Sequence, residues 1–506
     1  MTATGQPDDI AALAKGGRTN VAGFILKLGA RIPFLFIAGH LYGAALVGRF
    51  AIAVVVVELA ALVATLGLKR GLAQALSSAE RPHNHVVFDA LALALVASLI
   101  ASAALFAFPQ AMYPNSAIGG LDRLFPLIIL APALSDVSLA ALAYRLNIKA
   151  SVTARAIVEP WTLSIFAFLF SFFTLKDGLV LAYVASMVAA LVASIVPLLR
   201  SYGVPSGWSP HLSVLWQMAR ANTPLAGADA LEWGTRNADR YMLGLIFEPR
   251  VVGLYYMAQQ VASLPQKLKT SFDPVLGPVI TRSLADGDRA AVAAQVRQVG
   301  FWIVAAQTGL AVMGSMANES VMGVIGPQFV GAAAALSFLL FAEVAASTGA
   351  VCESALVYVA RHRNLVISVG MLAFQVMLSL SLIWGIRRAG FPLVWQAAGP
   401  AIALMLSLAI TSVLKARLLA RLVAAPVSGI RWRLVFAGII AAAAGAVVTI
   451  LPTQFELIEV LVEVPVIALV YFALVWFWVF KDADRALFRQ RPRAAAITLP
   501  PDELTR

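Results

Sequence analysis

Long apolar runs, each close to the roughly 20 residues that a helix needs to cross a bilayer, recur along nearly the whole chain. Short segments with Gly, Pro and charged residues separate them. This pattern predicts an all-α polytopic membrane protein with about fourteen transmembrane helices. The expected spans are 20–41, 46–68, 86–108, 121–143, 153–174, 178–199, 222–247, 252–275, 297–317, 329–358, 365–386, 394–414, 433–452 and 460–480.

Composition supports the membrane class. Of the 506 residues, 60% are hydrophobic and only 13% are charged, and the mean hydropathy is +0.85. The polar residues 1–19 do not resemble a cleaved signal peptide, so we expect them to form a cytoplasmic tail. The single cysteine, Cys352, can form no disulfide within the chain.

Lys and Arg residues predict the orientation because they favour cytoplasmic loops. Most lie in the two tails and the even-numbered connections between spans. The odd-numbered connections hold only Arg49, Arg123, Lys176, Arg250, Arg387 and Arg388. Both termini are therefore predicted to be cytoplasmic, in the cell inner (plasma) membrane. The net charge of +12 reflects this bias and not a nucleic-acid partner, because the cations are spread over short loops.

A weak internal repeat divides the chain. ALVGRFAIAVVV around Gly48 resembles RVVGLYYMAQQV around Gly253, 205 positions later. The same offset relates Arg31 to Arg236. If the repeat is real and not a chance match of common dipeptides, two six-helix lobes surround a central cavity. The expected divisions are an N-lobe at 20–199, a cytoplasmic linker at 200–221, a C-lobe at 222–414, two further helices within 433–480 and a cytoplasmic tail at 481–506.

One stretch, DALEWGTRNADRYMLGL from Asp229 to Leu245, is unusually charged for its apolar surroundings. On a helix its five charges share an arc of about 100°. They are Asp229, Glu232, Arg236, Asp239 and Arg240. The carboxylates could neutralise the two arginines within the helix. Alternatively, this face could line a water-filled pathway, because a buried ion pair rarely stabilises a fold by itself.

Other ionisable residues lie at membrane depth, where each normally faces a partner or a watery cavity. Lys27 and Arg31 share one face of the first span. They could pair with Glu58 or with the carboxylates of span seven, or line the cavity. The remaining buried carboxylates are each a potential proton or sodium site or an ion-pair partner: Asp136, Glu159, Glu343, Glu353 and Glu463.

Nothing in the sequence predicts catalysis. The chain has no GxxxxGK loop, no HExxH motif, no Gly-x-Ser-x-Gly elbow and no soluble domain that could hold a cofactor. His83 and His85 have too few neighbouring ligands for a metal site, so no metal is expected. A transporter with this sequence would need an ion gradient, the membrane potential or the substrate gradient as its energy source.

Several stretches resemble a known family. They are LYGAALVGRFAIAVVVVELAALVATLGLKRGLAQAL at 41–76, NADRYMLGLIFEPRVVGLYYMAQQVASLPQ at 237–266, GPQF at 326–329 and AAGPAIAL at 397–404. Together the chain looks like an oligosaccharide flippase, a polysaccharide-biosynthesis transporter of the multidrug/oligosaccharidyl-lipid/polysaccharide (MOP) exporter superfamily. The likeness covers residues 20–415 and identifies the superfamily better than the substrate.

The resemblance implies lobes that rock by alternating access and a cationic cavity that accepts a polyprenyl-pyrophosphate-linked oligosaccharide. Arg31 and Arg236 would meet the pyrophosphate, and Lys27 and Arg240 would extend the cationic track. Asp229, Glu232 and Asp239 would hold these cations in the empty state. The alternatives are an ion-coupled multidrug antiporter and a non-transporting scaffold for polysaccharide assembly. Coupling to H⁺ or Na⁺ and association with a polysaccharide polymerase or export machinery stay open.

The orientation can be tested with reporter fusions in every connection. We expect the connection between spans twelve and thirteen, which holds Lys415, Arg417, Arg421, Arg431 and Arg433, to report a cytoplasmic location. An external location for this connection would contradict the topology.

Overall fold

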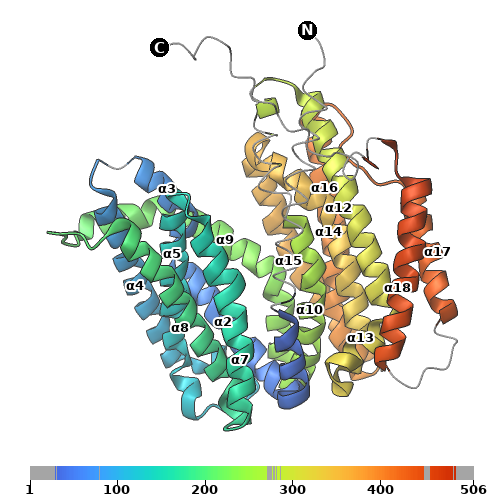
Figure 1. Ribbon diagram of the computed structural model, residues 1–506, viewed down its shortest axis with the longest axis horizontal. Coiled ribbons are helices and arrows are strands. Elements are labelled where there is room, and N and C mark those ends of the chain that lie inside the picture. Colours follow the sequence, from blue (N-terminus) through green and yellow to red (C-terminus); the bar gives the residue numbers. More distant parts are fainter. Residues whose placement is uncertain are drawn as a thin grey trace, which may run out of the picture.

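The computed structural model describes residues 31–78, 80–270, 286–448 and 456–482, together with residues 29, 276, 280, 282–284, 484 and 485. Within this part of the chain every regular element is a helix. Figure 1 shows two groups of helices that meet near α2 and α10 and diverge away from that contact. The molecule is therefore the two-lobed helical protein that the sequence predicts.

The first group is built from residues 38–202, and its helices pack against one another around α2 and α8. Its main elements are η1 (Ala38–Tyr42), α2 (Gly43–Ala64), α3 (Leu68–Ser77), α4 (His83–Ala107), η4 (Phe125–Ile129), α5 (Leu130–Tyr144), α6 (Ile148–Val152), η5 (Thr153–Val158), α7 (Glu159–Ser171) and α8 (Leu175–Tyr202).

The second group contains the later helices, with α14 and α16 packed together at its centre and α17 and α18 at its outer edge (Figure 1). Its elements are α9 (Leu212–Ile246), α10 (Pro249–Thr270), α12 (Arg289–Met316), α13 (Asn318–Ile325), η6 (Pro327–Ala332), α14 (Ala333–Val359), α15 (Arg361–Arg388), α16 (Leu393–Val423), α17 (Trp432–Val448), α18 (Glu456–Leu474) and η7 (Val475–Val479).

Ten helices of the described chain are long and apolar enough to cross a membrane, so the predicted number of about fourteen is not confirmed. The segment Arg31–Ser77 contains the first two expected spans, and Gly43 turns the chain between them. Helices α9 and α10 contain more polar residues than the ten, and the apolar helix Trp432–Val447 is shorter.

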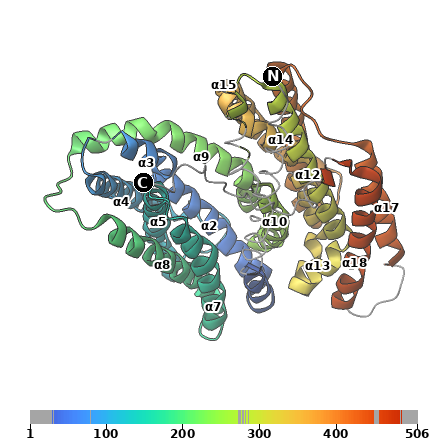
Figure 2. The same ribbon diagram turned by 45° about the horizontal axis from the view of Figure 1, so that its top comes forward.

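The connection between the lobes is shorter than the predicted linker at 200–221. Helix α8 continues to Tyr202 and ends where Gly203 adopts a φ of 70°. Helix α9 already begins at Leu212, so only residues 203–211 are non-helical. Although α9 comes after the linker in the sequence, it packs against α3, α4 and α2 of the first group before it reaches α10 (Figure 2).

Helices α2 and α10 cross at two glycines. A Cβ atom built on Gly48 would lie 1.7 Å from the carbonyl oxygen of Pro249, and one built on Gly253 would lie 1.9 Å from that of Ala44. Ala44 and Pro249, like Gly48 and Gly253, are 205 positions apart. Such reciprocal contacts are the signature of a two-fold axis. The crossing therefore lies on the axis that relates the two repeats.

Two side-chain amides make a second pair of reciprocal contacts between the lobes. Asn115 Nδ2 donates to the carbonyl oxygens of Gly244 at 2.8 Å and Phe247 at 3.2 Å. Gln328 Nε2 donates to the carbonyl oxygen of Gly39 at 2.9 Å, and its Oε1 accepts from the backbone N–H of Ala44 at 3.3 Å. Gly39 and Gly244 are again 205 positions apart.

Each of these amides follows a proline, Pro114 or Pro327, in the connection after the third helix of its repeat. We call the contacts of Asn115 and Gln328 the amide latch. The segments that it joins lie in odd-numbered connections or at the ends of the expected spans next to them, and the Lys/Arg pattern predicts these connections to be extracytoplasmic. The latch therefore ties the two lobes together at their predicted extracytoplasmic ends.

The crossing makes a stability prediction. Gly48→Ala should destabilise the protein by about 1–3 kcal/mol or more, because the added methyl group would collide with backbone atoms of α10. Thermal unfolding of the purified protein measures this. Gly370→Ala is the matched control, because no atom lies within 4 Å of the added Cβ and alanine favours the helix. Equal unfolding temperatures for Gly48→Ala and the unsubstituted protein would contradict the crossing.

Candidate functional site

The carboxylates at the start of the charged stretch, Asp229 and Glu232, form ion pairs with an arginine of α3. Glu232 also pairs with an arginine of α9 itself. Arg70 Nε lies 2.6 Å from Asp229 Oδ1, and Arg70 Nη2 lies 2.8 Å from Glu232 Oε2. Asp229 is buried, with 5% of its surface exposed. These ion pairs fasten α9 to the first lobe.

Arg236 lies one turn further along α9 and is partly exposed. Its Nη2 lies 3.1 Å from Glu232 Oε1, so it forms the pair within the helix that its spacing allows. Its backbone oxygen accepts a hydrogen bond from Gln259 of α10 at 3.0 Å. Glu232 thus contacts cations on two helices, Arg70 and Arg236.

Asp239 and Arg240 are buried where α9 meets α10. The hydroxyl of Tyr255 donates to Asp239, and the backbone N–H of Arg240 donates to the same carboxylate at 2.8 Å. The Arg240 guanidinium lies 5.1 Å from the centre of the Tyr256 ring, a cation–π distance. Arg240 also donates to the side chain of Asn237.

Arg31 reaches the same region from the first helix of the N-lobe. Its guanidinium donates to Gln260 Oε1 of α10. Glu58 of α2 and Tyr256 of α10 lie near both Arg31 and Arg240. We call Arg31, Glu58, Asp239 and Arg240 the central charge cluster. Its residues belong to the first helix and α2 of one lobe and to α9 of the other.

The predicted substrate-binding cations have different partners in the structure. Arg31 and Arg240 contact α10 at Gln260 and Tyr256, which lie about one turn apart, whereas the Arg236 guanidinium is bound to Glu232 of its own helix. Lys27, the further predicted ligand, lies outside the described residues.

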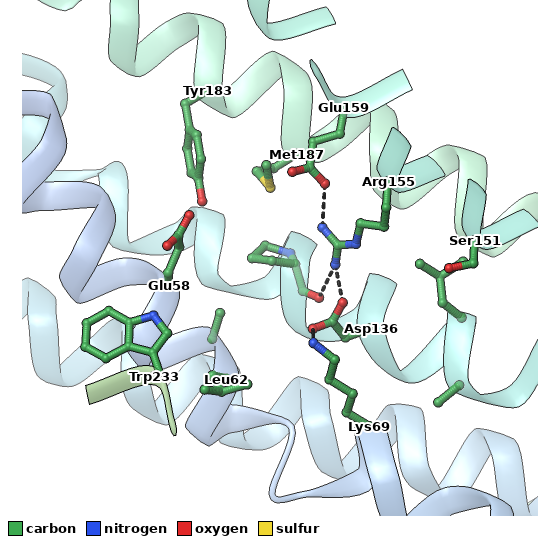
Figure 3. A pocket seen from close by; sticks show the side chains of 14 residues that line it. Glu58, Leu62, Lys69, Asp136, Ser151, Arg155, Glu159, Tyr183, Met187 and Trp233 are labelled. Atoms are coloured by element: carbon green, nitrogen blue, oxygen red, sulfur yellow. Dashed lines mark hydrogen bonds and ion pairs between the residues drawn. The ribbon is translucent and has the colours of Figure 1, made fainter. Parts of the chain in front are cut away.

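A cavity of about 530 Å³ opens beside the central charge cluster within the first lobe (Figure 3). Helices α2, α3, α5, η5, α7 and α8 contribute most of its wall, and Trp233 of α9 closes one side. Its polar and aromatic lining consists of Glu58, Lys69, Asp136, Ser151, Arg155, Glu159, Tyr183 and Trp233.

Arg155 stands at the centre of an ion-pair chain along this wall. Its guanidinium binds Asp136 through one nitrogen and lies 2.7 Å from Glu159 Oε2 through another. Lys69 Nζ lies 3.4 Å from the other oxygen of Asp136. Figure 3 shows the chain running from Glu159 through Arg155 and Asp136 to Lys69. Two cations thus neutralise two carboxylates.

Glu58 lies on the opposite wall and takes no part in this chain. Among the described residues its carboxylate has neither an ion pair nor a hydrogen bond, and Figure 3 shows it beside the Tyr183 hydroxyl. Its side chain is exposed to the cavity. Because Glu58 also lies near Arg31 and Arg240, it connects the cavity with the central charge cluster.

Two predicted carboxylates, Asp136 and Glu159, therefore serve as ion-pair partners. Their cation, Arg155, was not among the predicted site residues. It lies in η5, inside the apolar helical segment Lys149–Ser171. The four-residue spacing from Arg155 to Glu159 was the available signal. Within the described residues, no group of His, Cys, Asp and Glu could hold a metal ion.

The chain superposes on solved structures of transport proteins. The chain superposes on a structure described as lipid II flippase MurJ in an inward closed conformation, with a TM-score of 0.68, 12% sequence identity and coverage of 91% of this chain and 99% of that one. An inward-facing multidrug resistance MATE family transporter of the MOP superfamily gives a TM-score of 0.54, with 12% identity over 82% of this chain and 94% of the other. At these identities the likeness establishes the fold.

An outward-facing transporter of the same MATE family gives a TM-score of 0.52, with 13% identity over 83% of this chain and 99% of the other. No curated protein sequence matches the chain. A family model described as polysaccharide biosynthesis protein matches residues 45–334, which is more than half of the chain. This multi-pass membrane protein, with its two helical lobes and charged centre, therefore belongs to the polysaccharide biosynthesis protein family.

Proposed function

We propose that the protein is a flippase that moves a polyprenyl-pyrophosphate-linked oligosaccharide from the cytoplasmic to the outer leaflet of the inner membrane. The product would feed polysaccharide or lipopolysaccharide synthesis. The observation that carries the proposal is the central charge cluster, in which Arg31 and Arg240 contact successive turns of α10, at Gln260 and Tyr256, where the two lobes meet. Family membership and the transporter fold support it.

A pyrophosphate needs such a site. It carries at least two negative charges, and its oxygens accept charge-assisted hydrogen bonds from guanidinium groups in a bidentate geometry. The lipid tail can remain in the bilayer while the headgroup crosses between the lobes. Glu58 and Asp239 carry as many formal charges as the two arginines, so the substrate would take the place of carboxylates that are already near the cations. Arg236, paired with Glu232, and Lys27 would extend the cationic track.

Alternating access requires contacts that close one side of the molecule and then break. The amide latch and the glycine crossing are suited to this role, because both join the lobes near one end. A few hydrogen bonds, each worth about 0.5–1.5 kcal/mol, hold the lobes without locking them.

An ion-coupled multidrug antiporter is the second candidate. The cavity favours it, because Glu58 faces the aromatic rings of Tyr183 and Trp233, a lining suited to an organic cation. Transport of a cationic dye driven by a pH or Na⁺ gradient in liposomes, without movement of a lipid-linked sugar, would favour the antiporter.

The central charge cluster can be tested in liposomes that contain a lipid-linked sugar. We expect Arg31→Ala or Arg240→Ala to reduce the flipping rate about tenfold to a hundredfold, because each removes charge-assisted hydrogen bonds to the pyrophosphate. Arg31→Lys should retain part of the rate, since the charge survives without the bidentate geometry. Arg236→Ala should have a smaller effect, because Arg236 is bound to Glu232.

Arg388→Ala is the control, since Arg388 is an exposed arginine at the end of α15. Monodisperse size-exclusion profiles separate loss of transport from loss of folding. Full flipping by the Arg31→Ala, Arg240→Ala double variant would rule out the cluster as the substrate site. Polymer export in cells by a protein whose lobes are crosslinked would instead support a scaffold.

The amide latch predicts a shift between conformations. Asn115→Leu and Gln328→Met keep the side-chain shapes but remove the hydrogen bonds between the lobes. Each should shift the ratio of closed to open molecules about twofold to tenfold toward opening of the latched side. Spin labels on cysteines at Leu121 and Glu319, in a Cys352→Ser background, report the distance between the lobes.

Gln396→Met is the matched control for the latch, because the Gln396 amide binds the nearby backbone oxygen of Phe391 and not the other lobe. It should leave the distance distribution unchanged. Identical distributions for the unsubstituted protein and the double variant Asn115→Leu, Gln328→Met would contradict a role for the latch.

A further inference from the structure

A second polar pocket, of about 370 Å³, lies far from the lobe interface. It is formed by α12, by the segment before α17 and by the residues after η7. Its lining comprises Arg297, Gln298, Phe301, Ser428, Gly429, Ile430, Arg431, Lys481 and Asp484. Figure 1 shows α17 and α18 at the outer edge of the second lobe, on the side away from α2. The pocket is therefore distinct from the central charge cluster.

The lining of this pocket contains one carboxylate, Asp484, and neighbouring residues of the protein bind both of its oxygens. Asp484 is completely buried. It lies 2.5 Å from Arg431 Nη1, and it accepts hydrogen bonds from Gln298 Nε2 and the Lys481 backbone N–H, each at 2.7 Å. Arg431 in turn stacks 3.7 Å from the centre of the Phe301 ring. Arg431 and Asp484 thus form a neutral pair that joins the start of α17 to the end of η7.

Two cations of the pocket remain without such a partner. Within the described part of the chain, neither Arg297 nor Lys481 forms an ion pair, and both side chains are exposed. With Arg431 and Asp484 neutralising each other, the lining has a formal charge of about +2 from these two side chains. Gly429 brings the chain against α12, since a Cβ there would lie 2.5 Å from the Arg297 carbonyl oxygen. The site is therefore a preformed, positively charged recess.

Exposed aromatic side chains lie on the segments next to this recess. Trp432 is 79% exposed, Phe477 is 80% exposed and Trp478 is 39% exposed. Exposed tryptophans next to cations at the ends of apolar helices mark the level of the lipid headgroups. The Lys/Arg pattern predicts that this end of the molecule is cytoplasmic. The recess thus faces the leaflet in which basic sites between helices bind anionic headgroups.

We propose that this pocket binds the phosphate of an anionic phospholipid in the cytoplasmic leaflet. Arg297 and Lys481 are the phosphate ligands, and the exposed aromatic residues contact the lipid's glycerol and upper acyl regions. A bound lipid joins α12 to the ends of α17 and η7, so its stabilising effect should be visible in the intact protein. The proposal does not depend on the transported substrate.

The test uses the purified full-length protein in detergent with phosphatidylglycerol added in mixed micelles. We expect phosphatidylglycerol to raise the thermal unfolding temperature and phosphatidylcholine to leave it unchanged. The double variant Arg297→Gln, Lys481→Gln should bind phosphatidylglycerol at least tenfold more weakly, because both charge-assisted contacts are lost. Native mass spectrometry counts the bound lipid independently of stability.

The double variant Arg361→Gln, Arg363→Gln is the matched control, because it removes two exposed cations at the start of α15, outside the pocket. It should keep the lipid response. An equal loss in both double variants would attribute the response to general surface charge and overturn the proposal. The same stabilisation by inorganic phosphate alone would overturn the assignment to a lipid.

Discussion

The approach of α2 to α10 at Gly48 and Gly253 is the constraint on which the rest of the structure depends. Between helices in a membrane, lipid is as apolar as leucine, so association relies on close packing of small residues and on hydrogen bonds. Two glycines on a two-fold axis allow backbone contact in both directions at once. The amide latch then adds hydrogen bonds around this contact, from Asn115 of one repeat and Gln328 of the other.

Helix α9 carries the charged stretch and contacts both lobes. By chain order it is the first helix of the second lobe, yet Arg70 binds its Asp229 and Glu232 and fastens it to the first lobe. Its other end contacts α10 through Asp239 and Tyr255. A rocking motion of the lobes must therefore either carry part of α9 with the first lobe or break the Arg70 ion pairs. The contacts of the polar face of α9 must therefore change when the lobes move relative to each other.

The sequence predicted the helical class and the repeat, because apolar length and the glycine spacing are local signals. It could not predict the side-chain partners of the two α9 arginines, of which Arg236 binds Glu232 and Arg240 lies over Tyr256. The constant offset pairs Arg31 with Arg236, but the π-helix η1 (Ala38–Tyr42) follows Arg31, whereas α9 is α-helical to Ile246. A π-helix changes the rotational phase of the residues before it. Arg155 was missed for a different reason: its partner Asp136 lies on another helix, which no local pattern relates to it.

If the proposed substrate enters the central charge cluster, charge balance there favours coupling to an ion. The described members of the cluster comprise two arginines and two carboxylates, and the ion-pair chain of the cavity likewise comprises the cations Lys69 and Arg155 and the carboxylates Asp136 and Glu159. An empty centre of this kind is formally neutral.

A pyrophosphate with two negative charges entering a region of low dielectric would leave that charge uncompensated, at a cost of several kcal/mol. Uptake of protons or sodium ions removes the cost, and Glu58 is the carboxylate best suited to receive one, because it faces the cavity and forms no ion pair within the described chain. Coupling to an ion would then follow from electroneutrality at the site itself.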